Sequence, residues 1–137
     1  MQNLKYKNKY LQISCDGGAA TGKSTGARMI SKKYKNCCIE GRDISTKILP
    51  NSDVKFFFKC NLNIAAKRRY IELKKLNSNI KYKDVKKALR IRNFSDINRK
   101  NSPLLKHRDS IEIDTGKLNK QTMMAKMSKY IDKIKRL

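Results

Sequence analysis

Eight residues near the start of the chain have the types and the spacing of a loop that binds phosphate groups. They match the pattern G-x-x-x-x-G-K-[ST] and read Gly17-Gly18-Ala19-Ala20-Thr21-Gly22-Lys23-Ser24. In such a loop the backbone N–H groups surround phosphate oxygens, and the N-terminus of the following helix adds partial positive charge. We therefore predict that Lys23 reaches the β- and γ-phosphates of a nucleotide and that the Ser24 hydroxyl binds Mg²⁺.

This loop works only where a strand leads into it and a helix leads out. Residues Tyr10 to Cys15 are typical of a short buried strand, and residues Ser24 to Tyr34 have helical composition. Glycines at 17 and 22 let the backbone turn without a clash at Cβ. The alternative is a chance glycine turn before a helix, in which a lysine at the helix start would oppose the helix dipole.

The remaining patterns predict strands that alternate with helices. Strands are expected over Cys37–Glu40, Val54–Cys60 and Ile111–Asp114, and helices over Leu62–Leu76, Tyr82–Ile97 and Asn119–Leu137. Alternation of this kind specifies a parallel sheet covered by helices. The run Val54–Cys60 is apolar almost throughout, so it should lie in the middle of the sheet. The last helix should bury one stripe made of Met123, Met127, Ile131 and Ile134.

Several short motifs follow in the same order as in a known family. They are Asp16 to Ser24; Gly41-Arg42-Asp43-Ile44 with Pro50 and Asp53 downstream; Ala66 to Leu73; Arg92, Asp96, Asn98-Arg99 and Ser102-Pro103-Leu104; and Ile111 to Thr115. Together they resemble the bacterial cytidylate kinases, which are nucleoside-monophosphate kinases with a P-loop. The resemblance implies a single α/β domain over residues 1–137: a P-loop NTPase-type parallel sheet of about four strands, helices on both faces, and a projecting helical lid at about 62–100.

The resemblance also implies an activity and its residues. The chain would be a (d)CMP kinase that transfers the γ-phosphoryl group of Mg-ATP to CMP or dCMP. Catalytic residues would be Lys23, Arg68, Arg69 and Arg99; ATP would bind at Gly17, Gly18, Ala19, Ala20, Thr21, Gly22, Lys23, Ser24 and Thr25; the acceptor would bind at Arg42, Asp43, Arg92, Asp96 and Arg99; and Ser24 would hold Mg²⁺. Arg68 and Arg69 would close over the ATP phosphates.

One departure from the family lies between Tyr34 and Gly41. There the family carries a second strand and a long insert that binds the monophosphate, whereas this chain carries only a short link. The central β-α-β unit stays continuous without that insert. The alternatives are therefore a non-catalytic nucleotide-binding or RNA-adhering core, and an enzyme completed by a second chain.

The side chains themselves also allow plainer interpretations. Arg42 and Asp43 are a possible surface ion pair, Arg68 and Arg69 a solvated basic helix, and Arg92 with Asp96 a salt-bridge ladder. Arg92, Asp96 and Arg99 are spaced i, i+4, i+7, which predicts that they share one helical face. On that face they would serve the acceptor sugar and phosphate.

Composition sets further expectations. The formal net charge is +23, spread along the whole chain, which favours a solvated basic surface and only weak, salt-sensitive binding to nucleic acid. Cys15, Cys37, Cys38 and Cys60 form no C-x-x-C pair, so free thiols are predicted. No apolar run is long enough to cross a bilayer, and Met1 to Lys7 lack the apolar core of a secretion signal. We expect a cytoplasmic monomer without membrane contact.

Overall fold

The computed structural model describes residues 11–34 and 37–135. Tyr10, the two-residue link after Tyr34, the last residues of the expected C-terminal helix and the segment Met1 to Lys7 lie outside this description. Within it, the chain order is β1 (Gln12–Gly17), α1 (Lys23–Tyr34), β2 (Cys37–Gly41), η2 (Ile44–Ile48), β3 (Val54–Lys59), α2 (Leu62–Leu76), α3 (Tyr82–Asn98), β4 (Ile111–Asp114) and α4 (Lys120–Lys135). In the described ranges, no helix is both long and apolar enough to span a membrane.

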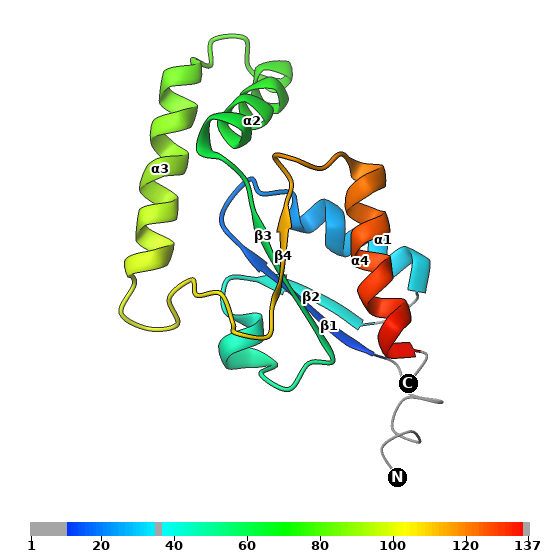
Figure 1. Ribbon diagram of the computed structural model, residues 1–137. Coiled ribbons are helices and arrows are strands. Elements are labelled where there is room, and N and C mark those ends of the chain that lie inside the picture. Colours follow the sequence, from blue (N-terminus) through cyan, green and yellow to red (C-terminus); the bar gives the residue numbers. More distant parts are fainter. Residues whose placement is uncertain (1–10, 35–36, 136–137) are drawn as a thin grey trace.

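The four strands form one parallel sheet in the order β2-β1-β3-β4. This confirms the predicted α/β class with a parallel sheet of four strands. β3 lies inside the sheet, as its apolar composition predicts, because both of its edges are paired. The carboxyl ends of the strands all point to the same edge, where the loops that follow them gather (Figure 1).

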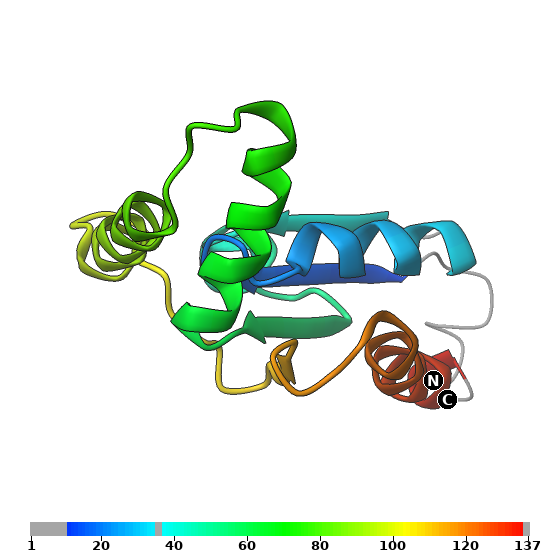
Figure 2. The ribbon, with the colours of Figure 1, turned by 90° about the horizontal axis from the view of Figure 1, so that it is seen from above.

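One face of the sheet is covered by α1 and α4, which pack against each other and against the strands (Figures 1 and 2). The core between them contains Phe56 and Phe58 from β3 and the predicted stripe of α4. Met123, Met127 and Ile131 are buried there, and Ile134 packs at the margin. The helix starts with reciprocal bonds between Asn119 and Thr122, so its N-terminus coincides with the expected one.

The other face of β1 is polar and is covered by the short helix η2. Ser14 is fully buried, and its hydroxyl lies 2.8 Å from that of Ser45 and 3.0 Å from that of Ser52. The Asp16 carboxylate, also buried, accepts hydrogen bonds from the N–H groups of Ile44 and Ser45 at 2.8 and 2.7 Å. Asp16 therefore fixes the loop after β2 against the end of β1.

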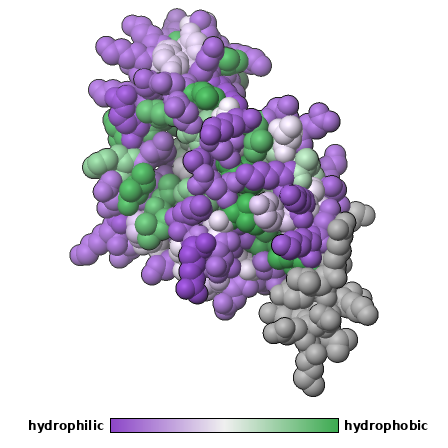
Figure 3. All heavy atoms as spheres, viewed as in Figure 1, coloured by the Kyte–Doolittle hydropathy of each residue, from purple (hydrophilic) through white to green (hydrophobic). Residues whose placement is uncertain are grey.

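Helices α2 and α3 project from the carboxyl edge of the sheet as a pair (Figure 1). They pack through a small cluster with Ala65 and Ala66 on one helix and Val85 and Leu89 on the other. Ala19 of the loop after β1 belongs to the same cluster, so the pair rests on that loop. Hydrophilic side chains cover most of the face seen in Figure 3, in keeping with the charge spread along the sequence.

Gly26 is a point of close approach between α1 and the sheet. A Cβ atom added there would lie 2.7 Å from Cζ of Phe58, whose ring is fully buried. We expect Gly26→Ala to lower the free energy of unfolding by about 1–3 kcal/mol, although alanine is favoured over glycine inside a helix by about 1 kcal/mol. Urea denaturation measures this. The loss should shrink in a Phe58→Leu background, and a gain in stability from Gly26→Ala would contradict the packing described.

Candidate active site

The loop after β1 is built as its sequence predicts. Gly17 has φ +156°, and a Cβ atom there would lie 2.5 Å from the carbonyl oxygen of Phe58, so the strand pairing itself requires glycine. Gly22 has φ +82°, a left-handed conformation that glycine adopts without a steric penalty. The next residue, Lys23, begins α1. The strand, the loop and the helix are thus joined in the geometry that presents backbone N–H groups to an anion.

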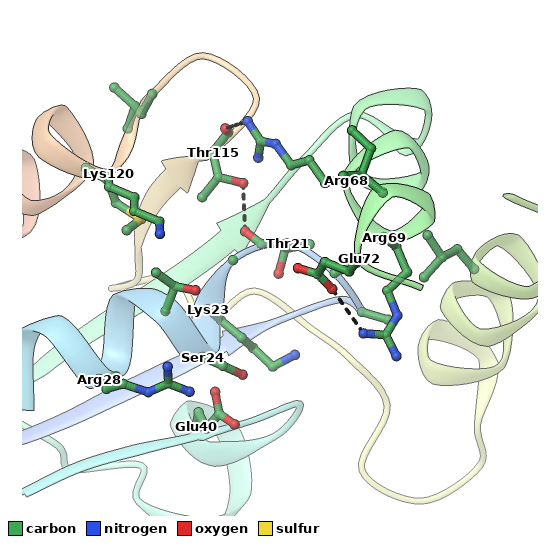
Figure 4. Close-up of a pocket in the computed structure, with 18 of the residues that line it drawn as sticks. Thr21, Lys23, Ser24, Arg28, Glu40, Arg68, Arg69, Glu72, Thr115 and Lys120 are labelled. Atoms are coloured by element: carbon green, nitrogen blue, oxygen red, sulfur yellow. Dashed lines mark hydrogen bonds and ion pairs between the residues drawn. The ribbon is translucent and has the colours of Figure 1, made fainter. Parts of the chain in front are cut away.

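Lys23 occupies the centre of this loop (Figure 4). Its ammonium group donates a hydrogen bond to the carbonyl oxygen of Gly18 at 3.1 Å, and the side chain is buried. Burial first, and then the positive charge of Arg42, lower the pKa of Lys23 to about 8, against the opposing effect of Glu40. A buried ammonium with one carbonyl partner retains donor capacity for an anion.

A cavity of about 1050 Å³ opens above the loop. It is lined by eleven of the predicted residues: Ala19, Ala20, Thr21, Gly22, Lys23, Ser24, Thr25, Arg42, Arg68, Arg69 and Arg92. Five others do not line it: Gly17, Gly18, Asp43, Asp96 and Arg99. Gly17 and Gly18 contribute to the loop without lining the cavity. Gly17 allows the backbone to pass close to Phe58, and the carbonyl oxygen of Gly18 accepts a hydrogen bond from Lys23.

Arg42 is held in the cavity by an ion pair that was not foreseen. Its Nε donates to Oδ2 of Asp96 at 3.0 Å, and both side chains are largely buried. Arg42 therefore pairs across 54 residues with helix α3. Among the described ion pairs, the partner of Arg42 is not the neighbouring Asp43, and the partner of Asp96 is not Arg92. The surface pair and the salt-bridge ladder considered above are not formed.

Arg99 does not share a helical face with Arg92 and Asp96. Helix α3 ends at Asn98, and Arg99 has the extended backbone of a residue beyond the helix end. Its guanidinium donates instead to the carbonyl oxygen of Ser102. The expectation of a shared face was wrong, because the i, i+7 spacing has meaning only while the helix continues. A role of Arg99 at the acceptor phosphate stays a prediction.

Arg68 and Arg69, which were predicted to form part of a lid, lie beside the loop. Arg68 donates through Nη2 to the carbonyl oxygen of Thr115 at 2.8 Å, and Arg69 pairs with Glu72 at 3.1 Å on the exposed side of α2. Figure 4 shows both arginines on one side of Lys23, with Arg28 and Lys120 on the other. Positive charge therefore surrounds the cavity from α1, α2 and α4.

Several residues that line the cavity were not assigned to the site from the sequence, among them Arg28, Glu40, Thr115 and Lys120. Arg28 follows Ser24 by one helical turn, a spacing that would have placed it on the same face. Glu40 is the acid at the carboxyl end of β2, next to β1, and Figure 4 shows its carboxylate below Ser24. Thr115 directly follows β4. Lys120 carried no signal that separates it from the other lysines.

The free thiols are as predicted in the described part of the chain. Cys15, Cys38 and Cys60 form no disulfide, and the side chain of Cys37 lies outside the described residues. The Cys15 and Cys38 sulfurs are 3.6 Å apart on neighbouring strands. No group of three or more metal-ligating His, Cys, Asp or Glu side chains occurs among the residues that the structure describes.

The titration of Lys23 predicts how anion binding changes with pH. Above pH 8 the free protein loses the Lys23 proton, and a bound phosphate must restore it, so we expect the affinity for a phosphate-bearing ligand to fall as the pH rises. We expect Kd to increase by roughly tenfold per pH unit once the pH exceeds this pKa. Calorimetric titration from about pH 7 to about pH 9.5 measures the slope. Lys23→Arg keeps its charge and should give a flatter profile; equal slopes would contradict the assignment.

Comparison with known proteins gives the family. The family model described as cytidylate kinase matches residues 31–133, a segment that begins after the loop at 17–24. A cytidylate kinase of Clostridium botulinum (strain Okra) is 40% identical over 104 residues, 76% of this chain and 48% of that protein. One of Clostridium tetani is 40% identical over 94 residues, 69% of this chain and 42% of that protein.

Among solved structures, an uncharacterized protein from Eubacterium ventriosum is similar in fold. The TM-score is 0.68 at 16% sequence identity, and the match covers 89% of this chain and 98% of the other. The chain spans about half the length of the curated relatives it matches. On the strength of the family model and these relatives, the chain belongs to the cytidylate kinase family.

Proposed function

We propose that the chain is an ATP-dependent nucleoside-monophosphate kinase that transfers the γ-phosphoryl group of Mg-ATP to CMP or dCMP. The observation that carries the proposal is the shared cavity: Lys23 of the phosphate loop and Arg42 of the acceptor motif line the same space. Their charges are close enough that Arg42 lowers the pKa of Lys23. Two anions bound there would neutralise both groups and would face each other.

On the donor side, the loop fits a triphosphate. The backbone N–H groups at the start of α1 and the Lys23 ammonium supply donors, and the carbonyl oxygen of Gly18 now occupies a position that a phosphate oxygen would take on Lys23. The exposed Ser24 hydroxyl and the Glu40 carboxylate supply oxygen ligands of the kind that Mg²⁺ prefers, directly or through water. The bound metal would neutralise charge on the β- and γ-phosphates.

On the acceptor side, Arg42 would bind the monophosphate. Asp96 fixes its guanidinium from one side, which leaves the other N–H groups for phosphate oxygens. Arg92 lines the cavity nearby, and Asp43 follows Arg42 directly. By similarity to the family, Asp43 would contact the cytosine amino group and Arg92 with Asp96 the sugar.

The reaction needs positioning and positive charge more than covalent help. The acceptor is already a phosphate oxygen, so no strong general base is required. Lys23, Arg42, Arg68 and Arg69 would surround the phosphoryl group as it moves. Closure of α2 over the cavity would exclude water and limit hydrolysis of ATP. A cavity of about 1050 Å³ lies at the upper end of the roughly 300–1,000 Å³ range of ligand pockets and leaves room for nucleotide-sized ligands.

The direct test is release of ADP from Mg-ATP, measured by a coupled assay with CMP, dCMP, UMP or AMP as acceptor. We expect CMP and dCMP to raise the rate far above that of ATP alone. If ATP binds but no monophosphate accelerates turnover, the kinase proposal fails, and the chain is then a non-catalytic nucleotide-binding core. Binding to RNA that falls steeply with added salt, without ATP binding, would instead favour an RNA-adhering protein.

A second chain that supplies the missing acceptor-binding part remains a distinct alternative. One observation favours it: the side chains of Ile91, Phe94 and Ile97 on α3 are 59%, 69% and 54% exposed. Apolar surface of this kind is often covered by another protein. Turnover of CMP that appears only when a co-purifying polypeptide is added would support this alternative, and turnover by the isolated chain would exclude it.

A further inference from the structure

Thr115, the first residue after β4, connects three parts of the cavity. The residue is buried, with 4% of its surface exposed. Its hydroxyl donates to the carbonyl oxygen of Thr21 in the phosphate loop at 2.7 Å, and its own carbonyl oxygen accepts from Arg68 of the lid at 2.8 Å. Its backbone N–H donates a hydrogen bond to the carbonyl oxygen of Lys59, at the end of β3, at 3.0 Å. One residue thus ties the loop and the lid to the sheet.

The bond to Thr21 fixes the direction of an N–H group. A trans peptide is planar, and its C=O and N–H bonds point in opposite directions. The Thr21 carbonyl accepts the Thr115 hydroxyl, so the N–H of Gly22, in the same peptide unit, points to the opposite side. Because glycine tolerates both signs of φ, this peptide can flip at low cost when nothing holds its carbonyl oxygen. A flipped peptide would aim an oxygen at a bound phosphate.

The methyl group of Thr115 also lies beside the loop, so its contribution has to be separated from that of the hydroxyl group. Its Cγ2 lies 3.3 Å from the position that a Cβ on Gly22 would take, so the side chain also covers Gly22. Hydroxyl and methyl are attached to the same carbon, and two conservative substitutions separate them. Valine keeps a methyl and loses the donor, whereas serine keeps the donor and loses the methyl.

We infer that Thr115 is a positioning residue for phosphate binding, which holds the Thr21–Gly22 peptide in the orientation that accepts an anion and keeps Arg68 beside it. The inference rests on the proposed function, because it concerns the site that would hold the ATP phosphates. It makes Thr115 part of the donor site without contact with the reacting atoms. In the absence of a nucleotide, the hydrogen bond to the Thr115 carbonyl oxygen holds Arg68 beside the loop, where its guanidinium can contact phosphates once they bind.

The test compares Thr115→Val with Thr115→Ser by calorimetric titration with Mg-ATP, tripolyphosphate and adenosine. We expect valine to raise Kd for ATP and tripolyphosphate by about three- to tenfold, the effect of one hydrogen bond, and serine to leave it near the wild-type value. Adenosine has no phosphates, so its binding should be the same in all three proteins. A general structural defect would weaken all three ligands.

Three results would overturn the inference. They are unchanged phosphate affinity in Thr115→Val, an equal loss in Thr115→Val and Thr115→Ser, and wild-type protein that binds no tripolyphosphate. Thr115→Cys, with a weaker donor, is measured alongside. If the valine protein does not fold, tighter binding by serine than by cysteine is the expected order, and the reverse order contradicts the inference. Binding that depends on Thr115 without turnover of CMP would refute only the proposed function.

Discussion

Lys23→Met is expected to lower kcat/KM for phosphoryl transfer by roughly a thousandfold, the loss typical when one preorganised donor is removed from developing charge. Lys23 is the one buried ammonium among the described residues that line the cavity. The coupled ADP assay measures the rate, and calorimetry measures the accompanying loss of ATP affinity.

A measurement of thermal stability distinguishes the loss of activity in Lys23→Met from a loss caused by unfolding. The lowered pKa of Lys23 means that its burial as a cation costs folding free energy below pH 8, so methionine removes a cost. The thermal midpoint of Lys23→Met should therefore equal or exceed that of the wild type at neutral pH. Lys129→Met, on the exposed side of α4, is the matched control and should keep full activity. Retention of ATP binding by Lys23→Met would contradict the donor site.

Arg42→Met is expected to lower kcat/KM for CMP by roughly a hundredfold, because it removes the proposed charged ligand of the acceptor phosphate and leaves Asp96 without its partner. The affinity for ATP at neutral pH should change much less. Arg108→Met serves as the control, since that arginine is almost fully exposed and does not line the cavity. A uniform loss for ATP and CMP would place Arg42 outside the acceptor site.

The same substitution has a second, independent signature. The charge of Arg42 lowers the pKa of Lys23, so its removal raises that pKa. The fall of ATP affinity with increasing pH should then begin at higher pH in Arg42→Met than in the wild type. An unshifted profile would show that the two cations do not interact, and the shared cavity would lose its main support.

Local patterns predicted most of the fold. The apolar run Val54–Cys60 predicted that β3 lies inside the sheet, and the stripe of methionine and isoleucine predicted that α4 packs on the sheet. Each of these depends on residues close in sequence. Helix η2 was not predicted, because its N–H groups at Ile44 and Ser45 are satisfied by the Asp16 carboxylate, 28 and 29 residues away.

The contiguous parts of the site were predicted from the sequence, whereas contacts between distant residues were not. The loop at 17–25 was recognisable because all its parts are contiguous. The Arg42–Asp96 ion pair could not be recognised in the sequence, since it joins residues 54 positions apart through the packing of α3. Arg99 was misplaced because the i, i+7 spacing was extended beyond the predicted helix end at Ile97, and the helix does end at Asn98. Thr115 was noted only as the end of the motif Ile111 to Thr115 and was given no role, because a threonine after a strand has no distinguishing type and only its contacts reveal its place in the site.

The most direct measurement is the amide spectrum of ¹⁵N-labelled protein during titration with Mg-ATP. We expect the largest chemical-shift changes at the amides of residues 19–25, with Gly22, Lys23 and Ser24 foremost, and we expect these changes to saturate together. Shifts confined to exposed lysines of α3, or an unchanged loop at saturating ATP, would contradict the claim that these backbone amides hold the triphosphate.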